Sequence, residues 1–167
     1  LCLEAHAPLV KKKRDADAFD KARQDIEQLR QRAQAGEIEL AYLDEAGFAQ
    51  VHPNRSAWTQ VGEQHCIDAP RGERLNVMAA WLSSGTIVPA QYWKTTNALV
   101  FLGFLMQLLA QVSKPLVVIL DNASIHKAQA IQSALKVLQE ENGLTLYFLP
   151  AYSPELNRIE MLWHTMK

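Results

Sequence analysis

The chain has 167 residues, of which 49% are hydrophobic and 21% are charged. That length is enough for one domain with a substantial buried core, and the composition excludes a disordered tail, a collagen-like repeat and an acidic solvating segment. With 17 Lys and Arg residues against 18 Asp and Glu residues, the net charge is −1. Any contact with a nucleic acid must therefore depend on local basic clusters rather than on the whole surface.

Cysteine usage and hydropathy favour a reduced, cytoplasmic protein. Cys2 and Cys66 are the two cysteines and have no CxxC spacing, which predicts free thiols rather than a zinc site or a disulfide framework. The longest apolar stretch, residues 98–106, is well short of the ~20 residues that a membrane-spanning helix needs. The first ten residues lack the hydrophobic segment of a signal peptide. We expect no membrane partner.

The first 36 residues differ in character from the rest and are predicted to form a basic N-terminal segment and a linker helix. A basic run at residues 11–14 precedes a helix expected over residues 15–35, which Gly36 would end. Two interpretations stay open for this helix, a linker or docking helix and a solvated surface helix. Its narrow apolar stripe consists of Phe19, Ala22, Ile26, Leu29 and Ala33.

From residue 38 onward, apolar runs and turn signals alternate as in an α/β domain. Helices are expected over residues 96–112, capped by Thr95 or Thr96 and buried almost all round, over residues 126–140, and from Ser153 to the end. Antiparallel-looking strands followed by alternating helix and strand predict a mixed sheet with helices on its faces. The predicted strands are residues 38–43, 58–61, 75–82, 86–93, 115–120 and 144–149.

Two aspartates, Asp44 and Asp121, follow hydrophobic strands directly. A carboxylate at the end of a buried strand costs free energy unless something neutralises it, although capping of the next turn is a common alternative. If the two strands are neighbours, the like charges repel each other until a divalent cation lies between them. Oxygen ligands favour Mg²⁺ or Mn²⁺ over zinc.

The last predicted helix offers Glu155 and Glu160 as a third carboxylate. The dipole of the helix explains an acidic residue in the first turn, such as Glu155. Glu160 lies in the second predicted turn and lacks that explanation, so spacing favours it weakly. Both flank an apolar arc made of Leu156, Ile159, Trp163 and Met166.

Three blocks of sequence carry a resemblance to a known family. The blocks are Tyr42-Leu-Asp44-Glu-Ala-Gly-Phe48, Leu120-Asp121-Asn-Ala-Ser-Ile-His126 and Leu149-Pro-Ala-Tyr-Ser-Pro-Glu-Leu-Asn-Arg-Ile-Glu160-Met-Leu-Trp163. Together, over about residues 37–167, they resemble the catalytic blocks of DDE transposases, in particular bacterial insertion-sequence enzymes related to the Tc/mariner superfamily. The family's pattern maps its catalytic triad onto Asp44, Asp121 and Glu160.

The resemblance implies a fold, an activity and partners. The fold is α/β and RNase H-like, a mixed five-stranded sheet flanked by helices over residues 37–167, truncated at both ends relative to the full protein. The implied activity is hydrolysis of phosphodiesters at transposon ends and strand transfer to target DNA. Asp44, Asp121 and Glu160 would hold two Mg²⁺ or Mn²⁺ ions. The partner is double-stranded DNA rather than a small-molecule substrate, and a homodimer is compatible with it.

Arg158 departs from the family, which commonly has Asn-Pro-Ile-Glu at this place. Arg should preserve the helix there and could contact a phosphate. Two alternatives stay open: another RNase H-like metal nuclease of the ribonuclease H or resolvase type, and a catalytically silent DNA-binding transposase remnant. Because nothing before residue 38 resembles a pair of helix-turn-helix units, we expect weak DNA binding with little sequence preference and a steep salt dependence.

Several other residues receive structural interpretations. Glu45 is expected to be solvated on the face opposite Asp44, and Asn122 to order the loop after its strand. His126 could approach the metal site or DNA, although a polar residue at a helix N-terminus is the favoured interpretation. Charge repulsion predicts that Asp121→Asn leaves the melting temperature of the metal-free protein unchanged or raises it slightly. Trp58, Trp81 and Trp93 are expected in the core, and cations that could line a DNA path are Arg55, Arg71, Arg74, Lys94 and Lys127.

Overall fold

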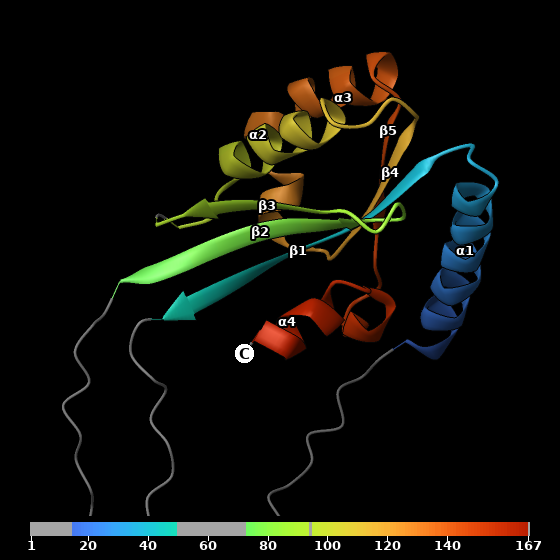
Figure 1. Cartoon of the computed structure of the whole chain (residues 1–167), viewed down its shortest axis with the longest axis horizontal. Coiled ribbons are helices and arrows are strands. Elements are labelled where there is room, and N and C mark those ends of the chain that lie inside the picture. The colour runs from blue at the N-terminus through green and yellow to red at the C-terminus, as the bar shows by residue number, and fades with distance from the viewer. Residues whose placement is uncertain (1–14, 50–72, 94, 167) are drawn as a thin grey trace, which may run out of the picture.

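A computed structural model describes residues 15–49, 73–93 and 95–166 (Figure 1). Its centre is a five-stranded sheet with the strand order β3-β2-β1-β4-β5. β1 (Glu39–Ala49) pairs antiparallel with β2 (Arg74–Leu82), which pairs antiparallel with β3 (Ile87–Tyr92). On its other side β1 pairs parallel with β4 (Leu116–Leu120), which pairs parallel with β5 (Leu144–Phe148). The predicted mixed sheet is confirmed.

Helices cover both faces of the sheet (Figure 1). α2 (Ala98–Leu109) and α3 (Gln132–Glu141) pack on one face, and α1 (Ala16–Gln34) and α4 (Glu160–Met166) pack on the other. Successive strand residues point to opposite faces, so Leu43 joins the α2/α3 cluster and Tyr42 joins the α1/α4 cluster. By the same alternation Asp44 points to the α1/α4 face and Glu45 to the α2/α3 face.

β1 continues well past the predicted end of its strand. Its pairing with β2 runs on from Asp44 opposite Ala79 to Ala49 opposite Arg74, so the prediction that Asp44 ends a strand is wrong. The continued ladder to β2 satisfies the backbone groups that a strand end would leave to a turn. Asp121, by contrast, does follow the last residue of β4. The strand predicted at residues 58–61 lies outside the described residues.

α1 forms as predicted, with one face against the sheet. The Asp15 side chain accepts a hydrogen bond from the N–H of Ala18 at 3.1 Å and so caps the helix. Ala22 and Ile26 are buried, and Gly36 takes the left-handed conformation, φ +77°, that ends the helical path. Among the described residues, no helix has the length and hydropathy needed to cross a membrane.

The remaining helices begin later than predicted. The cap of α2 is Asn97, whose side chain accepts from the N–H groups of Leu99 and Val100, rather than Thr95 or Thr96. Leu99 is 67% exposed and Met106 is 56% exposed, so α2 is buried on one face and not all round.

Short 3₁₀ turns stand in place of two predicted helix starts. Residues 124–127 and 129–131 form two such turns before α3, because Ala128 between them is extended, with φ −61° and ψ 134°. Pro154–Leu156 forms another turn, and Asn157, also extended, separates it from α4. Glu160 is consequently the first residue of α4 and does not lie in a second turn.

Candidate active site

Three carboxylates from distant parts of the chain line one pocket of about 360 Å³. Asp44 comes from the middle of β1, Asp121 from the residue after β4, and Glu160 from the start of α4. The wall between them is formed by residues 149–154, which lead from β5 to α4. The structure therefore brings together all three residues that the family's pattern selects.

Asp44 is held against α4 in a largely buried position. Its Oδ2 accepts a hydrogen bond from Nε1 of Trp163 at 3.0 Å. Burial, aided by the negative charges of Glu160 and Asp121, raises the pKa of Asp44 to about 6, although the backbone N–H of Glu45 and the bond from Trp163 act in the opposite direction. The Asp44 carboxylate is thus a group that would gain from a nearby positive charge.

Asp121 has the opposite electrostatic environment. Its Oδ1 lies 3.2 Å from Nδ1 of His126 and accepts the N–H of Ala123 at 3.0 Å. The hydrogen bond from His126, opposed by burial and aided by Ala123, lowers the pKa of Asp121. Burial opposes the charge on His126, but its contacts with the carboxylates of Asp121 and Glu45 outweigh that effect and raise the pKa of His126 to about 9.

Asn157 ties the start of α4 to β1. Its side-chain Nδ2 donates to the carbonyl oxygen of Leu43, the residue before Asp44, at 2.9 Å. The backbone carbonyl oxygen of Asn157 accepts the N–H of Glu160 at 3.1 Å. Asn157 itself is extended, so the helix begins after it. The register between Asp44 and Glu160 is set by one buried side chain.

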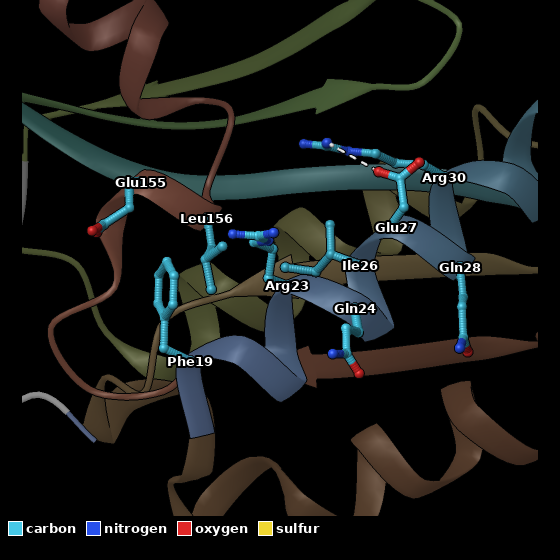
Figure 2. A pocket seen from close by; sticks show the side chains of 9 residues that line it. All are labelled: Phe19, Arg23, Gln24, Ile26, Glu27, Gln28, Arg30, Glu155 and Leu156. Carbon is cyan, nitrogen blue, oxygen red and sulfur yellow. Dashed lines mark ion pairs between the residues drawn. The ribbon is translucent and has the colours of Figure 1, made fainter. Parts of the chain in front are cut away.

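Glu155, the other carboxylate considered from the sequence, lines a different pocket. Figure 2 shows this hollow of about 780 Å³ between α1 and the turn that holds Glu155 and Leu156. Phe19 and Arg23 of α1 contribute to the same walls. None of the three carboxylates of the first pocket lines this second one, so the structure separates Glu155 from Asp44 and Asp121.

Two predictions near the pocket are wrong. Glu45 does point to the face opposite Asp44, but its side chain is 26% exposed and its Oε1 is buried rather than solvated. His126 is 4% exposed and contacts Asp121, so the favoured interpretation as a polar residue at a helix N-terminus is wrong and His126 lies beside a residue of the candidate site. Asn122 behaves as predicted, since its Nδ2 donates to the carbonyl oxygen of Leu149 at 2.9 Å and so orders the loop.

Three tryptophans of the described residues have different environments. Trp163, assigned from sequence to an apolar arc, also donates to Asp44, a role that no sequence signal indicated. Trp93 is 59% exposed, so its predicted place in the core is wrong. Trp81 is half-buried, and the guanidinium of Arg158 lies 4.3 Å from the centroid of its ring.

Several residues that are the subject of sequence predictions lie outside the described residues. These are the two cysteines, the basic run at residues 11–14, Trp58, Arg55, Arg71 and Lys94. Of the remaining candidate cations, Lys127 contacts Oδ1 of Asn122 and lies 4.7 Å from the centroid of the Phe148 ring. Lys127 is therefore near the loop that carries Asp121.

The donor set of the pocket suits a hard divalent cation. Three carboxylates offer oxygen ligands alone, the set that Mg²⁺ and Mn²⁺ prefer. Burial is the main cause of the raised pKa of Asp44, and the charges of Glu160 and Asp121 contribute to it. Within the described residues, no three His, Cys, Asp or Glu side chains already stand close enough together to form a complete metal cluster. The carboxylate oxygens of Asp44, Asp121 and Glu160 are ligands of the type that suits Mg²⁺ or Mn²⁺.

Comparison with known proteins gives a match to a family model and a curated relative. Residues 39–167 match the family model described as DDE superfamily endonuclease. A relative from Shigella sonnei, the insertion element IS630 uncharacterized 39 kDa protein, is 29% identical over 136 residues, which make up 79% of this chain and 38% of the relative. The chain thus spans well under half of that protein.

Solved structures of Mos1 mariner transposase have the same fold. The paired end complex with Mn matches at a TM-score of 0.62 with 20% identity, over 98% of this chain and 52% of that one. The catalytic domain alone matches at a TM-score of 0.57 with 19% identity, over 91% of this chain and 71% of that one. At such identities the likeness establishes the fold, and the predicted RNase H-like arrangement is confirmed.

Proposed function

We propose that this chain, which belongs to the DDE superfamily endonuclease family, contains the catalytic domain of an insertion-element transposase. The match to the family model covers residues 39–167, and it confirms the resemblance that the three sequence blocks carry. In this proposal residues 37–167 are the catalytic domain, and residues 1–36 are a basic segment and a linker helix that docks on it. The proposed setting is the bacterial cytoplasm.

The observation that carries the proposal is the shared pocket of Asp44, Asp121 and Glu160. Each carboxylate is supplied by a different element, and each has its own support: Trp163 for Asp44, His126 and Ala123 for Asp121, and the start of α4 for Glu160. A structural aspartate that caps a turn requires no second carboxylate nearby. Three that converge on one hollow favour a site for cations.

In the proposed reaction the carboxylates bind two Mg²⁺ or Mn²⁺ ions. Ions of this kind lower the pKa of an attacking water or hydroxyl and neutralise charge on the leaving oxygen of a phosphodiester. The chain's own part is to hold Asp121 ionised through His126 and Ala123, to orient Asp44 through Trp163, and to place Glu160 through Asn157. Hydrolysis at the element's ends, followed by attack of the freed 3′-hydroxyl on a target phosphodiester whose own 3′-oxygen leaves as a hydroxyl, needs no covalent enzyme intermediate.

The titles of the similar structures support double-stranded DNA as the partner. The Mos1 structures include a strand transfer complex and a paired-end complex with the left transposon end, and we propose that this chain likewise acts on element ends and target DNA, as a dimer. Arg158, stacked on Trp81 in a hollow that Glu160 also lines, is the proposed contact to a phosphate near the site.

A cleavage and strand-transfer assay tests this function. The 167-residue chain is incubated with duplex DNA that carries the element's ends, with Mn²⁺ or Mg²⁺. We expect cleavage and joining, and we expect Asp44→Asn, Asp121→Asn and Glu160→Gln each to abolish both. Glu141→Gln is the matched control, because Glu141 is exposed on α3 and lines neither the carboxylate pocket nor the hollow of Arg158, and it should retain activity.

The same assay separates the two alternatives. Cleavage without joining would favour a nuclease of the ribonuclease H or resolvase type, and binding without cleavage would favour a silent remnant. A salt titration of DNA binding adds a second measurement, for which we expect weak affinity with little sequence preference that falls steeply as salt rises. Tight, sequence-selective binding at physiological salt would contradict this expectation.

A further inference from the structure

Behind Asp121, on the α2/α3 face of the sheet, lies a buried contact between Glu45 and His126. Glu45 follows Asp44 on β1, and His126 lies in the 3₁₀ turn after Asp121. The Nε2 atom of His126 is 3.6 Å from Oε1 of Glu45. The contact therefore joins the strand that carries one active-site aspartate to the loop that carries the other.

The imidazole of His126 is fixed on three sides. Its Nδ1 lies 3.3 Å from the carbonyl oxygen of Asp121 and 3.2 Å from the carboxylate Oδ1 of the same residue. The ring of Phe101 packs against it with centroids 4.4 Å apart at an angle of 43°, and the whole side chain is 4% exposed. The position of His126 leaves its Nδ1 proton directed to Asp121.

The two atoms that face each other across the contact have no other partner. Within the described part of the chain, Oε1 of Glu45 and Nε2 of His126 are buried polar atoms without a hydrogen bond. Such atoms are rare in folded proteins because burial without a partner costs free energy. The two atoms lie 3.6 Å apart, and each can supply the hydrogen-bond partner that the other lacks. Burial of both atoms therefore favours the contact between them.

An arrangement of this kind orients a metal ligand. A carboxylate that holds one nitrogen of an imidazole fixes the ring, and the fixed ring orients whatever its other nitrogen contacts. Here the other nitrogen contacts the Asp121 carboxylate through Oδ1, which also accepts the N–H of Ala123. With Oδ1 held at two points, rotation of the carboxylate is restricted.

We propose that Glu45 and His126 form a positioning pair that fixes the Asp121 carboxylate for cation binding in the pocket. Neither residue lines that pocket, so both act through Asp121 and neither is a catalytic residue. This inference rests on the proposed function, in which Asp121 is a ligand of Mg²⁺ or Mn²⁺.

The test is the affinity of the metal-stripped protein for Mn²⁺, measured by electron paramagnetic resonance of the free ion. The variants are His126→Phe, which keeps an aromatic ring against Phe101, and Glu45→Gln, which keeps the volume. Loss of an outer partner of a metal ligand typically weakens affinity about 10–100-fold, and we expect that loss for His126→Phe and a smaller loss for Glu45→Gln. The double variant should bind no more weakly than His126→Phe alone, because Glu45 acts through His126.

Two further measurements separate positioning from folding. Thermal melts in chelator report the fold, and His126→Gln, which retains a side-chain N–H, should recover part of the Mn²⁺ affinity. If His126→Phe does not fold, the Mn²⁺ affinity of Glu45→Gln tests the proposal instead. Unchanged Mn²⁺ affinity in a folded His126→Phe variant, or in Glu45→Gln when His126→Phe does not fold, would overturn the proposal.

Asp121→Asn distinguishes this failure from failure of the proposed function. If Asp121→Asn binds Mn²⁺ as tightly as the wild type, Asp121 is not a ligand and the proposed site itself is wrong. If Asp121→Asn loses affinity while folded His126→Phe and Glu45→Gln keep it, the site stands and the positioning pair is refuted.

Discussion

The two faces of the sheet are held by different kinds of contact. The α2/α3 face is closed by apolar side chains, among them Phe101, Leu105 and Leu108, all with 0% exposure. The α1/α4 face adds long-range polar bonds: Arg30 to the Tyr42 hydroxyl at 2.8 Å, the Tyr147 hydroxyl to Asp25 at 2.9 Å, and Trp163 to Asp44. Apolar burial is non-directional whereas hydrogen bonds fix orientation. Apart from the Glu45–His126 contact, the α2/α3 face therefore contributes mainly stability, and the α1/α4 face adds bonds that fix orientation, including the one that orients Asp44.

The largest expected effect comes from the apolar face. Leu105→Ala removes a fully buried side chain of α2, and such substitutions cost about 2–5 kcal/mol of the free energy of unfolding. Urea unfolding in chelator measures this loss. If the two faces differ as described, the folded variant should bind Mn²⁺ with nearly wild-type affinity, and a loss of metal affinity larger than about tenfold would contradict the comparison.

A substitution on the α1/α4 face should change the pKa of Asp44 as well as the stability of the protein. Trp163→Phe keeps the aromatic ring and deletes the hydrogen bond to Asp44, for which we expect about 1.5–3 kcal/mol of lost stability at pH 8, where the carboxylate is charged. The pKa of Asp44 should rise above about 6, because the bond from Trp163 lowers it. Carbon-13 NMR titration of the aspartates measures the shift, and an unchanged pKa would refute the role of Trp163.

The two aspartates should respond to pH in opposite directions. The pKa of Asp44 is raised to about 6 from 3.8, so the folded state binds a proton more tightly and stability falls as pH rises through this window. Asp44→Asn should therefore gain stability relative to the metal-free wild type between pH 4 and pH 7. Urea unfolding at both values measures this gain.

For Asp121 the sign is reversed. His126 lowers the pKa of Asp121, so its contribution to stability is present above the ordinary pKa of an aspartate and is lost as pH falls through the lowered value. Asp121→Asn should consequently melt lower than the wild type in chelator at pH 7. This replaces the expectation from the sequence, which considered repulsion among carboxylates and not the partner that stabilises this one.

The smallest expected effect is that of Arg158. Its guanidinium stacks on Trp81 at an exposed position, where a cation–π contact contributes about 0.5–1 kcal/mol. Arg158→Ala should lower the free energy of unfolding by no more than this. A weaker salt dependence of DNA binding in the variant would support its contact with a phosphate, and an unchanged dependence would remove that assignment.

The sequence indicated the fold because hydrophobic periodicity follows burial. The run at residues 116–120 is buried at every position, and the stripe of α1 places Ala22 and Ile26 against the sheet, as the spacing predicted. The boundaries depend on partners that periodicity does not reveal. Pairing with β2 carries β1 beyond Asp44, and Asn157, which is extended and bonded to Leu43, precedes α4.

The site was predictable in part. Three sequence blocks pointed to Asp44, Asp121 and Glu160, and these do line one pocket, although their roles remain predictions. The supports around them were not predictable, because Glu45 and His126 are 81 positions apart and Trp163 reaches a residue 119 positions away. From sequence alone a polar residue is predicted to be solvated, because the sequence does not identify its buried partner.

The order of the three carboxylates along the chain has a consequence for synthesis. A ribosome releases Asp44 and Asp121 well before Glu160, which begins the helix that also carries Trp163. Because domains generally fold as units, the sheet strands that carry or flank the two aspartates do not complete the site by themselves. Until residues 157–163 follow, a nascent chain has neither the third carboxylate nor the donor to Asp44. Under the proposed function, a partly made protein cannot cut the DNA beside which it is produced.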